Sequence, residues 1–464
     1  MITNDPISYS IKDFFGNETF YEEEITPVNQ TAELELPKDK KGYFELTVYK
    51  NGETAAVTSY SVIDEYDFDS VNPAESPFGI NTSLRKNPQG VNEDALNREI
   101  RILGAKSIRD GSEWRSTELE KGVYTPQLND AEVRKLTEKY NIDYLYVAGY
   151  DNPLYDKNVS TNEGQTPWSS EGRAAFAAWT DWLAEDYRYI GVYNEWNGGF
   201  GKRGGSPADS KPLYYHLLAM SVYNNVKANH PETTLVGPAF AAGGYESGAD
   251  FMQSLGELGT LKYLDVIAGN AYRLDMTPEF ISERFKLIDE IIRKNNGGQS
   301  KEMWVTETGY PIYGDITEEK SAKYLVPLFV NALSAGVKRV FWYNLADYGI
   351  NKEDREQNYG LIRHCDSSMG ANTAKPSFSA YAVMTRKLTG LSYAEDISDT
   401  VNCHRFTDGQ KDCLVLWSYE GGEYKINTSK TAVLTDMMGN SREIAPVDGV
   451  IALEVTEYPI YLEL

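Results

Sequence analysis

Two glutamates each follow a short apolar, aromatic segment and have polar neighbours. Glu195 lies in YNEWN, directly after Asn194, and Glu307 lies in WVTETGYP. Taken alone, each segment is typical of a surface turn. A carboxylate at the end of a buried strand, however, is costly to desolvate. If the fold brings the two together, one carboxyl group can protonate a leaving oxygen while the other attacks an anomeric carbon.

The elements that must position these glutamates alternate along the middle of the chain. We predict strands over 77–82, 105–110, 143–149, 189–194, 233–239, 263–269, 302–307 and 337–344, and helices over 92–103, 130–140, 170–186, 209–230, 247–257, 277–297, 317–335 and 374–388. Such alternation indicates a parallel sheet. Eight units predict an α/β fold, a closed (β/α)8 TIM barrel with its chemistry at the C-terminal strand ends. Glu195 and Glu307 would then end strands four and seven at one mouth.

The two ends of the chain have β patterns instead. Residues 31–37 alternate, and residues 42–64 predict two strands joined at Asn51-Gly52, a hairpin signal. Hairpin patterns return after residue 390. We therefore predict an N-terminal β segment (1–75), a catalytic barrel (76–390) and a C-terminal β-sandwich domain (391–464). We expect both ends to form an accessory β-sandwich, the tail packing on the N-terminal strands or on the barrel.

The composition limits the partners. The 464 residues are 41% hydrophobic and 25% charged, which indicates a globular protein. The formal net charge of −24 argues against a nucleic acid or an anionic membrane as partner. No apolar run is long enough for membrane insertion. The 33 Tyr and 8 Trp suit core packing and also the stacking of sugar rings.

Metal and redox motifs are absent from the sequence. The 3 cysteines include no CxxC pair, and the 4 histidines include no HExxH motif, so we expect neither a metal site nor a cofactor. Cys403 and Cys413 flank a turn-like TDGQ segment. Either a cross-strand disulfide or two free buried thiols would fit that spacing.

The placement of Asn194-Glu195 and Glu307 resembles clan A of the glycoside hydrolases, which are retaining enzymes. Arg109 in GAKSIRDGSEW, Tyr272 in GNAYR and Trp342 in VFWYN match the same pattern, as does the segment QNYGLIRHCDSSMGANTAKPSFSAY after strand eight. The resemblance covers about residues 77–390, and the layout is most similar to family 39 and its relatives.

The resemblance implies a role for each matched residue. Glu307 is the expected nucleophile, bonded by Arg109 and Tyr272, and Glu195 is the expected acid/base. Asn194 would bond the sugar 2-hydroxyl, and the ring of Trp342 would form the floor of the −1 sugar site. Asn270 stands where many clan members carry His, which alters the hydrogen bonds of that site. Burial and the charge of Glu307 should raise the pKa of Glu195. The carboxyl groups of a retaining pair lie roughly 5–5.5 Å apart.

Further polar and aromatic residues follow strand ends. We predict that Trp114, Tyr150 and Trp196 bind substrate, with loop packing as an alternative that fits each of them equally well. The residues for which subsites and loop packing are equally good readings are Asn152, Tyr155, Tyr310, Tyr313 and Asp347, whereas core packing is favoured for Trp168, Trp179 and Trp182.

Residues 199–204 match GxGxxG, but they follow strand four, and no ribose-binding acid accompanies them, so we reject a nucleotide site. A loop beside Glu195 is the better reading. Its Lys202 and Arg203 would either contact an anionic sugar or be solvated.

The leading hypothesis is a retaining glycoside hydrolase that cleaves β-glycosidic bonds in an oligo- or polysaccharide by double displacement. The alternatives are a non-catalytic carbohydrate-binding barrel and a transglycosylase. No signal peptide is visible, yet polymer substrates favour a secreted, cell-surface or periplasmic location, with the cytoplasm left open. The sugar, the linkage, exo or endo action and the oligomeric state are not encoded in these motifs.

Overall fold

Parallel strands close into a barrel at the centre of the computed structural model, which describes residues 5–21, 24–34, 36, 39–84, 95–241 and 245–464. Within these residues the barrel strands are β5 (Phe78–Asn81), β6 (Ser107–Asp110), β9 (Asp143–Ala148), β10 (Tyr189–Val192), β11 (Thr234–Phe240), β12 (Val266–Asn270), β13 (Glu302–Thr308) and β14 (Val337–Trp342). β14 pairs with β5, which closes the ring. Each strand lies where the sequence predicts one, and the predicted barrel is confirmed.

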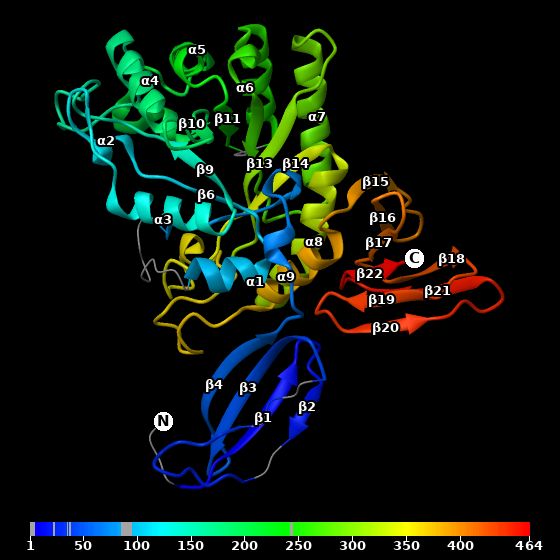
Figure 1. The fold of residues 1–464 in the computed structure, drawn as a ribbon. Helices are drawn as coiled ribbons and strands as arrows, with labels where there is room; N and C mark the ends of the chain where they lie inside the picture. Colours follow the sequence, from blue (N-terminus) through cyan, green and yellow to red (C-terminus); the bar gives the residue numbers. More distant parts are fainter. Residues whose placement is uncertain (1–4, 22–23, 35, 37–38, 85–94, 242–244) are drawn as a thin grey trace.

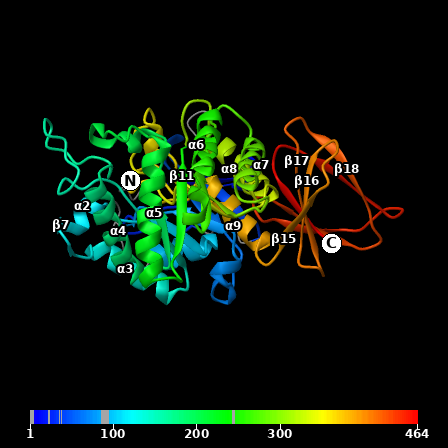
Figure 2. The same cartoon turned by 90° about the horizontal axis from the view of Figure 1, so that it is seen from above.

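Helices cover the outside of the barrel (Figures 1 and 2). They are the π-helical η4 (Ala95–Ile100) with α1 (Arg101–Leu103), then α3 (Leu128–Lys139), α4 (Ser170–Ala184), α5 (Pro212–Asn229), α6 (Tyr245–Glu257), α7 (Phe280–Asn295), α8 (Glu318–Ser334) and α9 (Pro376–Leu388). Residues 92–94 of the first predicted helix lie outside the described residues. Side-chain caps fix two of the starts: Ser169 accepts from the Gly172 N–H and Thr317 from the Lys320 N–H.

The barrel has two hydrophobic layers, as strand alternation requires. Side chains of one parity fill its interior, including Leu145, Tyr189, Trp304 and Phe341. Those of the other parity pack between strands and helices. Gly79 is needed in β5 because a Cβ there would lie 2.6 Å from the Phe341 ring.

A small insertion between β6 and β9 was not predicted. It contains α2 (Trp114–Thr117) and a short hairpin of β7 (Glu118–Glu120) and β8 (Val123–Tyr124). Its strands are too short to leave a periodic pattern in the sequence.

The N-terminal segment forms a four-stranded sheet in the order β2-β1-β3-β4. Its strands are β1 (Ser8–Asp13), β2 (Glu18–Tyr21), β3 (Gly42–Lys50) and β4 (Glu53–Val62). The predicted hairpin is present, with φ of 53° at Asn51 and 78° at Gly52. The strand predicted over 31–37 is wrong for its described residues, which form only a single bridge from Thr31 to Val28. An alternating sequence forms a strand only where a neighbouring strand is available for hydrogen bonding, and the alternation itself does not provide that neighbour.

The C-terminal segment is a sandwich in itself. One sheet has six strands in the order β15-β16-β17-β22-β19-β20, and β18 pairs with β21 to form the other. Their bounds are β15 (Ser392–Asp396), β16 (Asn402–Thr407), β17 (Asp412–Trp417), β18 (Gly422–Asn427), β19 (Ala432–Asp436), β20 (Ser441–Ile444), β21 (Val450–Val455) and β22 (Ile460–Glu463).

The two faces of the larger sheet decide whether Cys403 and Cys413 can form a disulfide. Cys403 packs in the core between the two C-terminal sheets, whereas Cys413 lies in the cluster shared with the barrel. The two side chains therefore point to opposite faces, and both are free thiols. The disulfide alternative is wrong.

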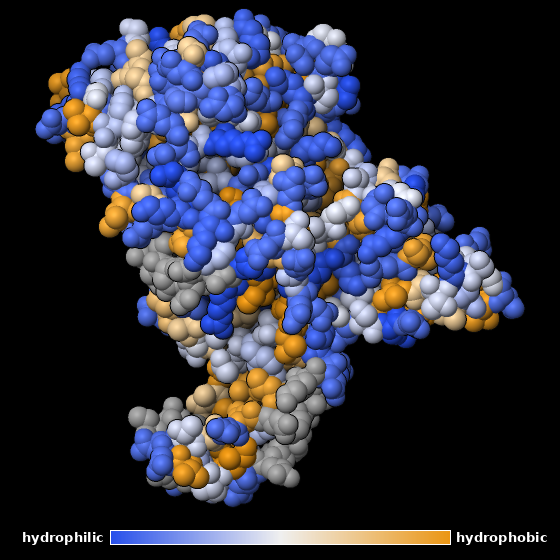
Figure 3. All heavy atoms as spheres, in the orientation of Figure 1, coloured by the Kyte–Doolittle hydropathy of each residue, from blue (hydrophilic) through white to orange (hydrophobic). Residues whose placement is uncertain are grey.

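The terminal sheets remain separate from each other (Figure 1). They meet at a small cluster that includes Tyr43, Met437 and Met438, beside a 2.9 Å hydrogen bond from the Lys41 N–H to Asn440 Oδ1. The surface in the view of Figure 3 is largely hydrophilic, in keeping with the charged composition. None of the helices in the described residues combines the length and the apolar character that crossing a bilayer requires.

Candidate active site

A cavity of about 910 Å³ opens at the C-terminal ends of the barrel strands. Its wall includes residues at or just after these ends: Asn81, Arg109, Tyr150, Asn194, Glu195, Tyr272, Glu307 and Tyr343. The barrel thus brings both predicted catalytic glutamates to one cavity.

Glu307 is held by two donors. Arg109 Nη1 lies 2.5 Å from Glu307 Oε1, and the Tyr272 hydroxyl donates to Oε2 at 3.1 Å. The pairing of β12 with β13 shifts by one residue just before Glu307. Such a bulge re-aims side chains. It lets Thr306 donate to Asn270 Oδ1 while Glu307 also faces the cavity.

Glu195 projects from backbone that has left the strand. Tyr193 and Glu195 have φ of 66° and 48°, in the left-handed region that costs free energy for residues other than glycine. Asn270 Nδ2 donates to Glu195 Oε1 at 2.9 Å. Burial, followed by the charge of Glu307, raises the pKa of Glu195 to about 7. The hydrogen bond from Asn270 and the charge of Arg109 act in the opposite direction.

A continuous set of hydrogen bonds connects the two glutamates. Arg109 Nη2 donates to Asn194 Oδ1 at 2.8 Å, and Asn270 Nδ2 lies 3.2 Å from the same oxygen. Asn270 also bonds Glu195, and Arg109 also bonds Glu307. Asn194, which contacts both Asn270 and Arg109, therefore fixes the position of Glu195 relative to Glu307. Its own Nδ2 lies 3.4 Å from the Tyr150 hydroxyl and faces the cavity.

Several residues of the wall were not predicted from the sequence. Asn81 accepts from Arg109 Nη1 at 2.9 Å. It ends the first barrel strand, so the strand-end argument applied to the other residues would have found it. Tyr343, Tyr348 and Tyr359 also line the cavity. The last two lie in a long loop with no periodic signal.

The expectation for Trp342 is wrong. Its side chain is 0% exposed and packs between the barrel and its helices, away from the cavity wall. The reason is strand parity: Phe341 points into the barrel interior, so Trp342 points outward. The aromatic ring that reaches the cavity here is that of Tyr343, the residue directly after β14.

Trp114 and Trp196 are core residues as well, and neither lines the cavity. Trp114 donates to Glu118 Oε2 at 2.5 Å and stacks on Tyr155. Trp196 donates to the Lys211 carbonyl at 3.1 Å. Their indole N–H groups are satisfied within the protein, which is why they can be fully buried.

The remaining candidates divide in the same way. Four of them pack within the protein, away from the cavity wall: Asn152, Tyr155, Tyr310 and Asp347. Tyr313 also lies outside that wall, but it is 40% exposed and is not a packing residue. Trp168, Trp179 and Trp182 pack with the main core, as favoured.

The 199–204 loop does lie beside Glu195. Arg203 lines the cavity, but ion pairs with Asp151 and Glu113 already engage its guanidinium. Lys202 is solvent-exposed and pairs with Asp209 at 3.2 Å. Neither residue is a ready receptor for an anionic sugar.

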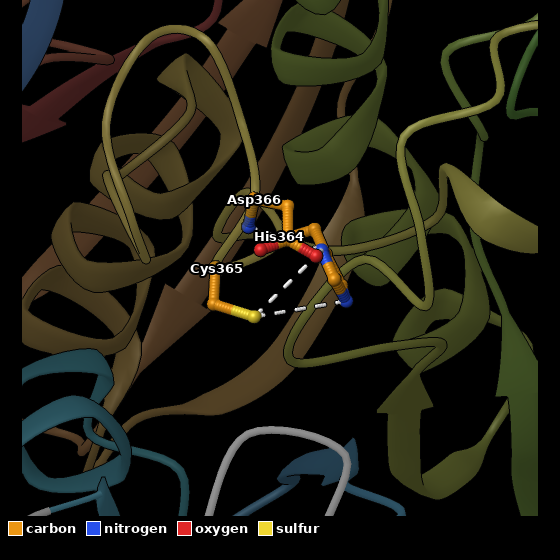
Figure 4. A group of neighbouring side chains, drawn as sticks. All are labelled: His364, Cys365 and Asp366. Atoms are coloured by element: carbon orange, nitrogen blue, oxygen red, sulfur yellow. Dashed lines mark hydrogen bonds and ion pairs between the residues drawn. The ribbon is translucent and has the colours of Figure 1, made fainter.

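One group of side chains in the described residues has the composition of metal ligands. His364, Cys365 and Asp366 lie on the loop after β14, with candidate ligand atoms within 4.8 Å of one another (Figure 4). His364 Nδ1 accepts a hydrogen bond from the Asp366 N–H at 3.1 Å, so that nitrogen is occupied. This group lies outside the cavity wall.

No protein-family model and no curated protein matches the sequence. Solved structures do match. A family 39 glycoside hydrolase from Bacteroides cellulosilyticus WH2 superposes with a TM-score of 0.78 at 22% identity, over 99% of this chain and 94% of that one. A monomeric β-xylosidase from Caulobacter crescentus CB15 gives 0.60 at 13% identity, over 84% and 96%. A family 30 endoxylanase from Clostridium papyrosolvens C71 gives 0.57 at 12% identity, over 85% and 98%. The chain therefore shares the fold of the family 39 and family 30 glycoside hydrolases, the clan A enzymes that its sequence resembles.

Proposed function

We propose that the protein is a retaining glycoside hydrolase that cleaves β-glycosidic bonds in an oligo- or polysaccharide. The observation that carries the proposal is the unequal environment of two carboxyl groups in one cavity. Glu307 accepts from Arg109 and Tyr272, which suits an ionised nucleophile. Glu195 has a pKa raised to about 7, which suits a proton donor.

In the first step, a Glu307 oxygen attacks the anomeric carbon while the bond from that carbon to the leaving oxygen breaks. Glu195 transfers its proton to the leaving oxygen, so the leaving sugar departs as a neutral alcohol. Attack by Glu307 requires that both its carboxylate and the sugar are held in place. Arg109 binds Glu307 and Asn194 with the same guanidinium, and Asn194 is the residue expected to bond the sugar 2-hydroxyl. Arg109 therefore links the nucleophile to the residue that holds the sugar.

In the second step, Glu195 removes a proton from water, and the water oxygen displaces Glu307 from the anomeric carbon. The Glu307 charge, which raises the pKa of Glu195 in the free protein, is absent from the ester intermediate. The pKa of Glu195 therefore falls when the residue must act as a base. Two inversions at one carbon give net retention.

Neutral sugars are the substrates that we favour. The arginines of the wall have carboxylate partners: Arg109 with Glu307, Arg203 with Asp151 and Glu113, Arg273 with Asp275, and Arg355 with Glu356. An anionic sugar would have to displace one of these partners. Because the similar structures include a β-xylosidase and an endoxylanase, β-xylosides and xylan are the first substrates to try.

The test is hydrolysis of aryl β-glycosides, xylan and β-glucans by the wild type, Glu307→Ala and Glu195→Ala. We expect Glu307→Ala to lose turnover and to regain it with azide, giving a glycosyl azide of inverted configuration. Full activity of Glu307→Ala would exclude Glu307 as the nucleophile. A wild type that binds glycans without cleaving them would favour a non-catalytic barrel, and oligosaccharide products longer than the substrate would indicate transglycosylation.

We also propose a location outside the cytoplasm, in the medium, at the cell surface or in the periplasm. The support is substrate logic, since polymeric glycans do not enter cells intact. Fractionation of the native host with an antibody to the protein tests this proposal, and enrichment in the cytoplasmic fraction would contradict it.

A further inference from the structure

Phe200 is an aromatic residue of the cavity wall that the mechanism does not use. It lies on the loop between β10 and α5, shortly after Glu195, and is 36% exposed. Gly198 and Gly199 continue the same wall between the two residues. Glycine at 199 has open space where a Cβ would be, so no side chain from that position covers the Phe200 ring.

The backbone that carries Phe200 is fixed. Its carbonyl accepts from the Tyr193 hydroxyl at 3.0 Å and from Thr166 Oγ1 at 3.1 Å. A Cβ on Gly201 would collide with the Trp196 carbonyl oxygen, and Gly204 has a φ of 67°. Close packing thus explains the glycine at 201, and a left-handed backbone explains the one at 204.

The ring itself is also held in place. Phe200 stacks on Tyr150, with ring centroids 4.8 Å apart and an interplanar angle of 24°. The Arg203 guanidinium lies 4.8 Å from the Tyr150 centroid and is anchored by Glu113 and Asp151. Tyr150 contacts Asn194 through its hydroxyl. The exposed part of Phe200 is therefore a preorganised apolar surface at the edge of the catalytic network.

We propose that Phe200 is the stacking platform for the sugar ring of the leaving group, an inference that rests on the proposed function. The proton donor must lie next to the leaving oxygen, so the leaving group occupies the Glu195 side of the cavity. Phe200 offers an apolar ring on that side, because its loop follows Glu195 directly and Gly198, Gly199 and Phe200 continue the same wall. A flat ring complements the C–H face of an uncharged pyranose. The site thus accepts a neutral sugar, rather than a small alcohol, as its leaving group.

The test compares substrates with and without a leaving sugar. Kinetics of Phe200→Ala, Phe200→Tyr and wild type are measured on xylotetraose and β-D-xylosyl fluoride, and on cellotetraose and β-D-glucosyl fluoride. We expect Phe200→Ala to lower kcat/KM for a tetrasaccharide about tenfold, the size of a good aromatic contact, and to leave the fluoride unchanged. Phe200→Tyr keeps the ring and should retain activity. Phe15→Ala, which removes a 41% exposed ring from the N-terminal segment, is the matched control.

The outcomes separate the two proposals. Equal losses on fluoride and tetrasaccharide, or no loss on either, would overturn the platform while leaving the glycosidase intact. If the wild type cleaves no probe, the proposed function fails, and the platform is tested by calorimetric binding of both tetrasaccharides. Equal affinities of wild type and Phe200→Ala, including no binding by either, would then overturn the platform.

Discussion

Asn270 influences the proton chemistry of the site through a single hydrogen bond. Its amide donates to Glu195 and so favours the charged form of that carboxyl group, against the effect of burial. The same amide contacts Asn194, and its oxygen accepts from Thr306. If Glu195 is the proton donor, as proposed, Asn270 positions it through this hydrogen bond.

Replacing Asn270 should shift the pH dependence of the first step. In the wild type, kcat/KM should fall above about pH 7, because the deprotonated Glu195 cannot act as an acid. Asn270→Ala removes a donor to the charged form, so the pKa of Glu195 rises and the basic limb moves to higher pH. Steady-state kinetics between pH 5 and 9 measure the limb, with the exposed Asn229→Ala on α5 as control. An unmoved limb would show that this hydrogen bond does not tune Glu195.

Glu195 should also lower the stability of the fold at neutral pH. A carboxyl group whose pKa rises from 4.5 to about 7 on folding binds protons more tightly in the folded state, so stability decreases as pH increases through this window. Each pKa unit corresponds to about 1.4 kcal/mol, so the full penalty is about 3 kcal/mol. Glu195→Gln should be more stable than wild type at pH 8 by about this amount and nearly equal at pH 4. Denaturant titrations at both pH values test it, and an equal difference at both would point to packing instead.

The positions of these residues were partly predictable from the sequence. Both glutamates, Arg109, Asn194 and Tyr272 could be placed because strand ends of a parallel barrel converge, and all five line the cavity. The three tryptophans could not, since composition does not say which side of a strand or loop a ring faces. Trp342 differs from Tyr343 by one position, and one position reverses the direction of a strand side chain.

At the scale of elements, strand order was predictable and loop structure was not. Most barrel strands have an apolar signal, whereas residues 344–375 after β14 have no period and yet supply Tyr348, Glu356 and Tyr359 to the cavity. What holds this loop is a contact between its ends. Asp347 Oδ1 accepts from Lys375 Nζ at 2.7 Å and from the Gly360 N–H at 2.8 Å, and both side chains of the ion pair are buried.

Removing one partner of this buried ion pair should lower the stability of the fold more than removing both partners. Lys375→Met leaves a buried carboxyl group without its cation and should cost roughly 3–5 kcal/mol, whereas Asp347→Asn with Lys375→Met removes both charges and should recover much of that loss. KM should rise in Lys375→Met because the loop carries wall residues. Thermal unfolding of the single and double variants is the measurement. If the double variant is no more stable than the single one, the unpaired carboxyl group of Asp347 is not the cause of the lost stability.

At the scale of the whole molecule, the N-terminal sheet is docked on the barrel by a few polar contacts. The buried Arg363 donates to Ser59 Oγ of β4 at 2.7 Å and to the Ala374 carbonyl at 2.6 Å, and it pairs with Glu318 of α8 at 2.5 Å. The sheet topology was predictable in part from its hairpin. The docking was not, because these partners are far apart in sequence.

Arg363→Met should loosen this docking. The substitution leaves Glu318 without its partner and should cost roughly 3 kcal/mol. It should also expose residues 63–77, which connect β4 to the barrel, to proteolysis. Limited digestion followed by mass spectrometry tests this, with the exposed Lys40→Met as control. Unchanged cleavage sites and rates would mean that the sheet is held by its apolar contacts alone.

The opposite facing of the two β-sandwich cysteines has a practical consequence for labelling. Burial raises the pKa of Cys403 to about 11 and that of Cys413 to about 12, so both react slowly with electrophiles. Cys365, the remaining cysteine of the chain, is partly exposed. A maleimide dye should therefore attach once to the native protein and three times after denaturation. Because Cys365 belongs to the same loop as Tyr359, the natural sequence already offers a single attachment point for a fluorophore that reports on ligand binding.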